Sequence, residues 1–230
     1  MLAFDIETQG LSPETAEVTC ICACDPETGL ALTVIPSLTP AEFAALDGVL
    51  PGLSVDPETI LAALDRADRV CAFHGARFDI PFLRARYGIP AERAGAWMLK
   101  LVDVYEATFQ AFGRAFGLNA LLAANGLPSK TDSGANAILL ARQREWRRLG
   151  EYCMADAAKT HRVSSLARVA LPVRGGASLW LVDGRFVTVD IQVLATPGCE
   201  GVARHEGCHP VAHPAGHDDA VPANRGMNHP

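Results

Sequence analysis

Acidic side chains occur at three separate places in the chain where they could act on one ligand. The first pair is Asp5 and Glu7, at the end of an apolar run (residues 2–6) expected to be a buried strand. Because side chains alternate along a strand, these two carboxylates project from the same face. Two carboxylates on one face repel each other unless a cation lies between them. The pair therefore predicts either an ordinary acidic strand end or part of a cation site. The absence of any Lys or Arg before Arg66 favours the cation site.

The other two places are expected to be helical. Asp79 follows an apolar run at residues 70–73 and stands at a helix start, where the helix dipole favours an anion. Tyr152 and Asp156 are four residues apart in a helical run, so they share one face. A carboxylate with apolar neighbours is costly to bury unless it is paired or binds a metal. Taken singly, Asp79 is also typical of a helix cap, and Tyr152 with Asp156 of a core tyrosine and a surface aspartate.

Together, the three motifs resemble the DEDD superfamily of 3′–5′ exonucleases, in its tyrosine-containing branch. LAFDIET (residues 2–8) is similar to the first family motif, HGARFDIPFLRARYGI (74–89) to the second and YCMADAAKTHRV (152–163) to the third. The last two are also similar to the proofreading domains of family A and family B DNA polymerases. The stretch KLVDVYEATFQAF (100–112) resembles the segment between the second and third motifs. The resemblance covers roughly residues 1–170.

This resemblance implies a fold, a reaction and a set of site residues. The implied fold is α/β and ribonuclease-H-like, with a mixed sheet whose first three strands are antiparallel and whose later strands are parallel, flanked by helices. The implied reaction is hydrolysis of phosphodiester bonds from the 3′ end of single-stranded nucleic acid, with DNA favoured over RNA, in proofreading or repair. By the motif match, Tyr152 positions the attacking water, and the metal-binding acids are Asp5, Glu7, Asp79 and Asp156.

The expected cofactors follow from the acids. Four carboxylates with no basic partner nearby suit two hard divalent cations, Mg²⁺ or Mn²⁺, which prefer oxygen ligands. Two such ions about 3.5–4 Å apart activate a water and stabilise the leaving oxygen of an in-line displacement. The expected partners are the 3′ ends of single-stranded DNA or RNA, with a DNA polymerase as a further candidate. The alternative is a catalytically idle nucleic-acid-binding module or an accessory subunit of a polymerase, and the intact acids favour the enzyme.

The second motif departs from the family, whose members usually carry an Asn four or five residues before its Asp. This chain has His74 and Gly75 there. The change is expected to affect binding of the substrate strand more than the chemical step. His74 is either a substitute donor or a core histidine. Residues 142–174 hold eight Lys or Arg against three acids, which fits a solvated helix face or a phosphate-facing surface. Trp146 among them either stacks a base or anchors its helix. The candidate substrate-binding residues are His74, Phe78, Arg142, Trp146 and Lys159.

Local signals predict the elements that must position these residues. Two strand-like runs, at residues 17–24 and 30–35, predict an antiparallel meander with the first strand. The segments 39–42 and 56–58 each carry a helix-start signal, with a capping side chain, a proline and a glutamate. Gly88 is expected to end the helix that begins near Asp79.

Three segments are expected along the chain: a catalytic domain over residues 1–172, a β-hairpin appendage over 173–195 and a tail over 196–230. From Val104 to about Leu171 the pattern predicts helices, with a break around Gly150. Asp183-Gly184 predicts a type I′ turn within the hairpin. The tail has five Pro, five Gly, five His and no Leu, Ile or aromatic residue, so it is expected to be disordered. Its Cys and His residues are zinc-binding types, but their spacing fits no standard zinc pattern.

Composition limits the class of protein. With 230 residues, 49% of them hydrophobic and 20% charged, the chain is neither wholly disordered nor a collagen-like repeat nor a coiled coil. No run approaches the roughly eighteen apolar residues of a membrane span, and the start of the chain has no pattern of a secretory signal. Cys20, Cys22 and Cys24 alternate along one expected strand, which suits reduced, buried thiols. We therefore expect a cytoplasmic protein.

Overall fold

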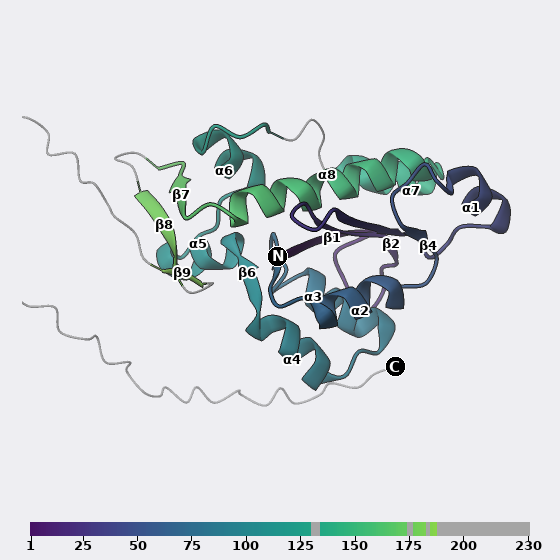
Figure 1. The fold of residues 1–230 in the computed structure, drawn as a ribbon, viewed down its shortest axis with the longest axis horizontal. Helices are drawn as coiled ribbons and strands as arrows, with labels where there is room; N and C mark the ends of the chain where they lie inside the picture. The colour runs from purple at the N-terminus through teal and green to yellow at the C-terminus, as the bar shows by residue number, and fades with distance from the viewer. Residues whose placement is uncertain (130–133, 174–176, 183–184, 188–230) are drawn as a thin grey trace, which may run out of the picture. The chain divides into compact units, whose positions relative to one another are not determined.

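A computed structural model of the chain describes residues 1–129, 134–173, 177–182 and 185–187. Its central feature is a mixed sheet, in which the described residues contribute six strands in the order β4-β3-β2-β1-β5-β6 (Figure 1). The strands are β1 (Leu2–Thr8), β2 (Val18–Asp25), β3 (Leu30–Val34), β4 (Leu53–Ser54), β5 (Val70–Ala72) and β6 (Leu101–Asp103). The architecture is thus the mixed α/β sheet expected from the sequence.

The strand directions also follow the expectation. β1 pairs antiparallel with β2, and β2 pairs antiparallel with β3, which confirms the meander. β5 then pairs parallel with β1, and β6 parallel with β5. The two-residue strand β4, which the sequence did not suggest, pairs parallel with β3 at the edge. β1 is therefore held on both sides, and its acidic end is fixed by the centre of the sheet.

Helices cover both faces of this sheet (Figure 1). On one face, α7 and α8 contact β1, and α8 also contacts β2 and β5. On the other face, α2 and α3 contact β2, with α4 packed against both of them. The helices of the described residues are α1 (Pro40–Leu46), α2 (Glu58–Arg66), α3 (Asp79–Tyr87), α4 (Ala91–Leu99), α5 (Val104–Phe112), α6 (Leu118–Ala124), α7 (Gly134–Arg142) and α8 (Trp146–Ser164).

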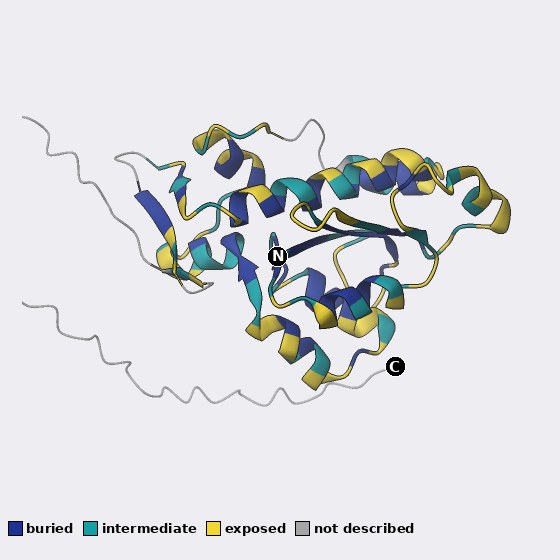
Figure 2. Ribbon diagram, in the orientation of Figure 1, coloured by how far each residue is buried: buried dark blue, intermediate teal, exposed yellow. Residues whose placement is uncertain are grey.

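Strand β2 separates two hydrophobic cores because its side chains alternate between the faces of the sheet. Ile21 and Ala23 belong to the core under α2, α3 and α4. Cys20 and Cys22 belong to the core on the opposite face, together with Leu149 of α8. Figure 2 shows the strands buried between helices whose outer faces are exposed. The alternating cysteines predicted to be buried therefore all face one side, toward α8.

The helix starts and stops follow their sequence signals. The Thr39 hydroxyl accepts a hydrogen bond from the Glu42 N–H at 3.3 Å, and the Thr39 N–H donates to the Glu42 carboxylate at 2.8 Å, which confirms the capping box of α1. Ahead of α2, the carboxylate of Asp56 accepts from the N–H of Glu58 at 2.9 Å. Helix α3 ends at Gly88, whose φ of 63° is left-handed.

The expectation of a helix up to about residue 171 is wrong. Residues Arg168–Leu171 form strand β7, which pairs antiparallel with β8 (Ala177–Val182). Val169 and Leu171 alternate with more exposed neighbours and are buried in a third core with residues of α5 and α6. A run of four residues is too short for its period to be recognised, and pairing with β8 decides its conformation.

Strand β8 also pairs antiparallel with β9 (Arg185–Val187), so the predicted hairpin is present. Its turn at residues 183–184 and the tail at 196–230 lie outside the described residues, as do the Cys and His residues considered for zinc. Because β7 and β8 pair with each other, the hairpin extends a three-stranded sheet that begins within the predicted catalytic domain. Among the helices of the described chain, none combines the length and apolar character needed to cross a membrane.

The predicted break around Gly150 is also wrong, since α8 continues through it. A Cβ atom added at Gly150 would lie 2.8 Å from Leu50 Cδ1 and 3.4 Å from Thr33 Cγ2. Gly150 therefore allows α8 to pack closely against Leu50 and Thr33. A glycine within a helical run indicates a helix stop. The close contact that Gly150 serves leaves no local pattern in the sequence.

Gly150→Val is expected to lower the free energy of unfolding by about 1–3 kcal/mol, because the added methyl groups must displace Leu50. Gly95 in α4 gives the matched control, since a Cβ there would meet nothing within 4 Å. Gly95→Val should change stability by no more than about 0.5 kcal/mol. Urea denaturation measures both variants. Equal losses at the two glycines, or no relief of the Gly150→Val loss by Leu50→Ala, would contradict the close contact.

Candidate active site

The carboxylates of Asp5 and Glu7 lie together on β1, as strand alternation predicts. Their oxygens and the Sγ atom of Cys153, on α8, all lie within 4.8 Å of one another. Cys153 Sγ also donates to the carbonyl oxygen of Asp5 at 3.4 Å. Helix α8 is therefore packed directly against the segment of β1 that carries both acids.

Tyr152 directly precedes Cys153 on α8, and Asp156 lies one helical turn after Tyr152. The Asp156 side chain is buried. The pKa of the Tyr152 hydroxyl is raised, first by burial and then by the negative charges of Asp156, Glu7 and Asp5. A side-chain hydrogen bond with Asp156 adds to this rise. The tyrosine hydroxyl therefore lies in the field of three carboxylates, and α8 brings the third motif to the first.

Asp79 approaches β1 from the other layer, as the first residue of α3. Burial and then the charge of Asp103 raise the pKa of Asp79 to about 8. The backbone groups of Asp79 itself and of Ile6 partly offset this rise by hydrogen bonding to the carboxylate. Ile6 lies between Asp5 and Glu7 in sequence, so Asp79 meets β1 at the level of the acidic pair. The second motif therefore also meets the first.

Asp103, at the end of β6, is a buried acid that the sequence interpretation missed. Its carboxylate accepts hydrogen bonds from the backbone N–H groups of His74 at 3.1 Å, Ala76 at 3.0 Å and Glu106 at 3.2 Å. The third bond caps α5, and the D-x-x-E spacing from residue 103 to 106 could have suggested that cap. The first two bonds fix the turn that leads into α3. Asp103 is therefore a positioning residue for Asp79.

The same turn explains the departure from the family at His74 and Gly75. His74 has a left-handed φ of 74°, which is uncommon for a residue other than glycine. A Cβ at Gly75 would lie 2.4 Å from the Cβ of Ala72, so the turn requires glycine there. The His74 ring lies 4.0 Å from the ring of Tyr105 and nearly parallel to that of Phe78, and burial lowers the pKa of His74. Both candidate substrate-binding residues of this turn are thus part of one partly buried aromatic stack.

The remaining candidates for substrate binding lie on α7 and α8. Lys159 Nζ is 3.6 Å from Asp156 Oδ1, one helical turn further along α8. The ammonium group therefore stands at the edge of the acidic group, and the expectation that the four acids have no basic partner nearby is wrong for Asp156. Arg142 is exposed at the last residue of α7.

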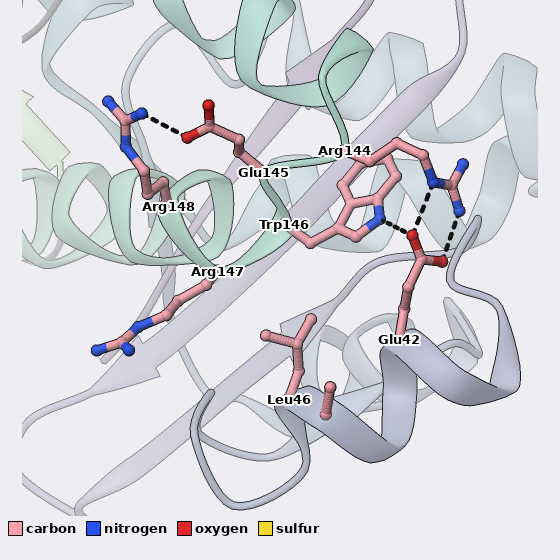
Figure 3. Close-up of a pocket in the computed structure, with 8 residues that line it drawn as sticks. Glu42, Leu46, Arg144, Glu145, Trp146, Arg147 and Arg148 are labelled. Carbon is pink, nitrogen blue, oxygen red and sulfur yellow. Dashed lines mark hydrogen bonds and ion pairs between the residues drawn. The ribbon is translucent and has the colours of Figure 1, made fainter.

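Trp146 lies at the start of α8 and is only 4% exposed. Its indole N–H donates to the Glu42 carboxylate at 2.9 Å, and Arg144 Nε donates to the same carboxylate at 2.7 Å. Figure 3 shows both side chains meeting Glu42 of α1. Arg147 and Arg148, also drawn there, each form an ion pair with a glutamate. Arg144 and Trp146 thus tie the start of α8 to α1, which is the geometry of the helix-anchor alternative.

The donor set fits hard divalent cations. Asp5, Glu7, Asp79 and Asp156 offer carboxylate oxygens, the ligands that Mg²⁺ and Mn²⁺ prefer. Buried carboxylates are destabilised by desolvation and by nearby negative charge, and the raised pKa of Asp79 has these two causes, burial and the charge of Asp103. A cation would relieve both. The assignment of catalytic and metal-binding roles to these residues stays a prediction.

Comparison with known proteins bears on the fold and the family. A family model, RNase_H_2, described as belonging to the RNase H superfamily, matches residues 2–167. The match confirms the resemblance of the motifs to the DEDD superfamily, and it confirms the ribonuclease-H-like fold class. It spans the acids of all three motifs. No curated protein matches the chain.

Several solved structures resemble the chain over part of their length. The family B DNA polymerase from the hyperthermophilic archaeon Pyrobaculum calidifontis has 16% identity and a TM-score of 0.47, over 70% of this chain and 23% of the polymerase. A nuclease in its apo form has 16% identity and a TM-score of 0.43, over 70% and 68%. Product-bound exonuclease I has 16% identity and a TM-score of 0.39, over 66% and 45%. The chain thus spans less than a quarter of the polymerase and less than half of exonuclease I.

The raised pKa of Asp79 predicts a pH-dependent stability. An acid whose pKa is higher in the folded state contributes stability that is complete below its unfolded value, here 3.8, and that is lost as the pH rises through the folded value, about 8. In cation-free protein, we therefore expect Asp79 to lower the thermal midpoint progressively between pH 4 and pH 8. Asp79→Asn should flatten this fall, and Mg²⁺ should reverse it in the wild type at pH 8.

Thermal denaturation at a series of pH values, with and without a chelator, tests this expectation. Asp68→Asn is the control, because Asp68 is an exposed aspartate outside the site. It should keep the wild-type profile. If the wild type and Asp79→Asn have parallel profiles from pH 4 to pH 8, the buried-carboxylate interpretation is wrong.

Proposed function

This chain belongs to the RNase H superfamily, and from that membership we propose that it is a 3′–5′ exonuclease of single-stranded nucleic acid, with DNA preferred over RNA. Its proposed role is proofreading or repair. The observation that supports the proposal best is the packing of α8 against β1. Through it, Tyr152 lies in the field of Asp156, Glu7 and Asp5, as a water-positioning tyrosine beside metal-binding acids must.

In this proposal, two divalent cations, Mg²⁺ or Mn²⁺, are held by Asp5, Glu7, Asp79 and Asp156. When bound, the ions supply an activated water and stabilise the leaving oxygen of an in-line phosphodiester displacement. The protein contributes a rigid arrangement of acids from three elements. β1 is fixed by strands on both sides, while α3 and α8 approach it from opposite layers.

Tyr152 orients the attacking water. A tyrosine hydroxyl keeps its proton at neutral pH and can both donate and accept a hydrogen bond. Burial and the neighbouring carboxylates raise the pKa of Tyr152 further, so they favour this protonated form. A hydroxyl that neither takes nor gives up a proton contributes by orientation, which is a part of the rate enhancement in many hydrolases.

The substrate strand is proposed to meet aromatic and basic side chains around the acids. His74 and Phe78 offer ring surface beside the start of α3, on which a base can stack. Lys159, next to Asp156, and the exposed Arg142 offer positive charge to phosphates. Trp146 contributes indirectly, by anchoring the start of α8 through Glu42.

Asp156→Asn is the variant that separates catalysis from binding. It keeps the size of the side chain but removes a charge that holds a cation, so cleavage of an end-labelled single strand should be abolished. Binding of the strand should be unchanged or tighter, because a negative charge near phosphate is gone. Stability without cations should hold or rise, since repulsion among the carboxylates is relieved. Gel analysis of degradation and fluorescence anisotropy of binding measure the two properties.

Tyr152→Phe is the graded companion in the same experiment. It removes only the hydroxyl and should slow cleavage by about 10–1000-fold, the scale of one positioned catalytic hydrogen bond. DNA and RNA strands labelled at either end, with Mg²⁺, Mn²⁺ or chelator, report substrate and direction. If wild type and both variants degrade the strand at one rate, the activity is a contaminant. Tight binding without any cleavage by the wild type would favour the idle binding module.

A further inference from the structure

Three thiols lie together next to the acidic pair of β1. Cys20 and Cys22 project from β2 toward α8, and Cys153 projects from α8 toward them. Their three Sγ atoms all lie within 4.8 Å of one another, and those of Cys20 and Cys22 are 3.8 Å apart. All three side chains are fully buried and are free thiols. The proposed nuclease reaction uses none of them.

We propose that Cys20, Cys22 and Cys153 form a binding site for a thiophilic d¹⁰ metal ion such as Zn²⁺, Cd²⁺ or Cu⁺. Soft thiolate ligands select these ions over Mg²⁺ and Mn²⁺. A metal–sulfur distance of about 2.3 Å separates two sulfurs of a tetrahedral site by about 3.8 Å. The two sulfurs of β2 already have this separation. The third comes from the facing helix, so an ion would lie between β2 and α8.

The atoms around the thiols support such a site. Cys22 Sγ lies 3.6 Å from the carbonyl oxygen of Gly150 and 3.9 Å from Thr33 Oγ1. Cys153 Sγ lies 3.4 Å from the carbonyl oxygen of Asp5. Contacts such as those with Thr33 and Asp5 orient thiol ligands in metal sites. The Gly150 carbonyl is also an oxygen that can complete the coordination of an ion bound to three sulfurs.

The thiol site and the carboxylate site are neighbours with different chemistry. Cys153 borders both, because its Sγ also lies within 4.8 Å of the carboxylate oxygens of Asp5 and Glu7. Hard cations bind the oxygens and thiophilic ions bind the sulfurs. An ion held by the three sulfurs would link α8 to β2, the strand paired with β1, and so stiffen the packing of α8 on the sheet that places Tyr152. We expect its binding to raise the thermal midpoint, whether or not the protein is a nuclease.

Titration of the 230-residue chain with Cd²⁺ tests the proposal, because the ultraviolet charge-transfer band of cadmium thiolates reports sulfur ligands alone. Cys199 and Cys208, which lie outside the described residues, are replaced by serine in every sample. The band should saturate at one Cd²⁺ per chain, and the thermal midpoint should rise. Cys153→Ala and Cys22→Ala should each weaken binding by about 100-fold or more. Zn²⁺ and Cu⁺ added as competitors identify the preferred ion.

Cys24→Ala is the matched control, because Cys24 is two residues beyond Cys22 on the same face of β2 but packs in a different cluster. It should bind Cd²⁺ as the parent does. If Cys153→Ala is unfolded by circular dichroism, Cys20→Ala provides the test from the strand side. The proposal is overturned if the parent shows no charge-transfer band, or if the folded cluster variants bind Cd²⁺ as tightly as Cys24→Ala.

Discussion

The contact between helix α8 and strand β1 brings the buried carboxylate of Asp156 close to the partly buried carboxylates of Asp5 and Glu7, and the candidate site depends on it. Burial of a charge is costly and like charges repel one another, and at Asp79 burial and then the charge of Asp103 raise the pKa to about 8. The ammonium group of Lys159 offsets part of the negative charge at Asp156. Carboxylates placed so close together lower the stability of the fold. A bound ligand of positive charge would offset this cost. Hard cations that bind phosphate as well as carboxylate fit this requirement.

The surrounding structure keeps the carboxylates in place by ordinary interactions. Cys153 donates to the backbone of Asp5, and Gly150 lets α8 pass within contact distance of Leu50. On the other side of the sheet, Asp103 accepts two hydrogen bonds from the turn that leads into α3. Each of these groups acts on the backbone or through packing, and together they fix the elements that carry the acids.

Local sequence was sufficient for the features that depend on one element. Strand alternation gave the pairing of Asp5 and Glu7, and capping signals gave the helix starts. Local sequence does not predict the features that depend on distant residues. Asp103 bonds to residues almost thirty positions earlier, Gly150 serves a contact with Leu50, and β7 exists because it pairs with β8. In each case the deciding partner lies outside any local window, and only the motif resemblance linked the three acidic places to one another.

Calorimetric titration with Mn²⁺ at pH 7, in two buffers with different heats of ionisation, tests the central claim most directly. If the buried carboxylates share cations, binding must displace the proton that Asp79 carries at that pH. The account predicts release of about one proton per chain, seen as a difference in heat between the buffers, and loss of that difference in Asp79→Asn. Equal heats in both buffers, or no binding of Mn²⁺, would contradict the account.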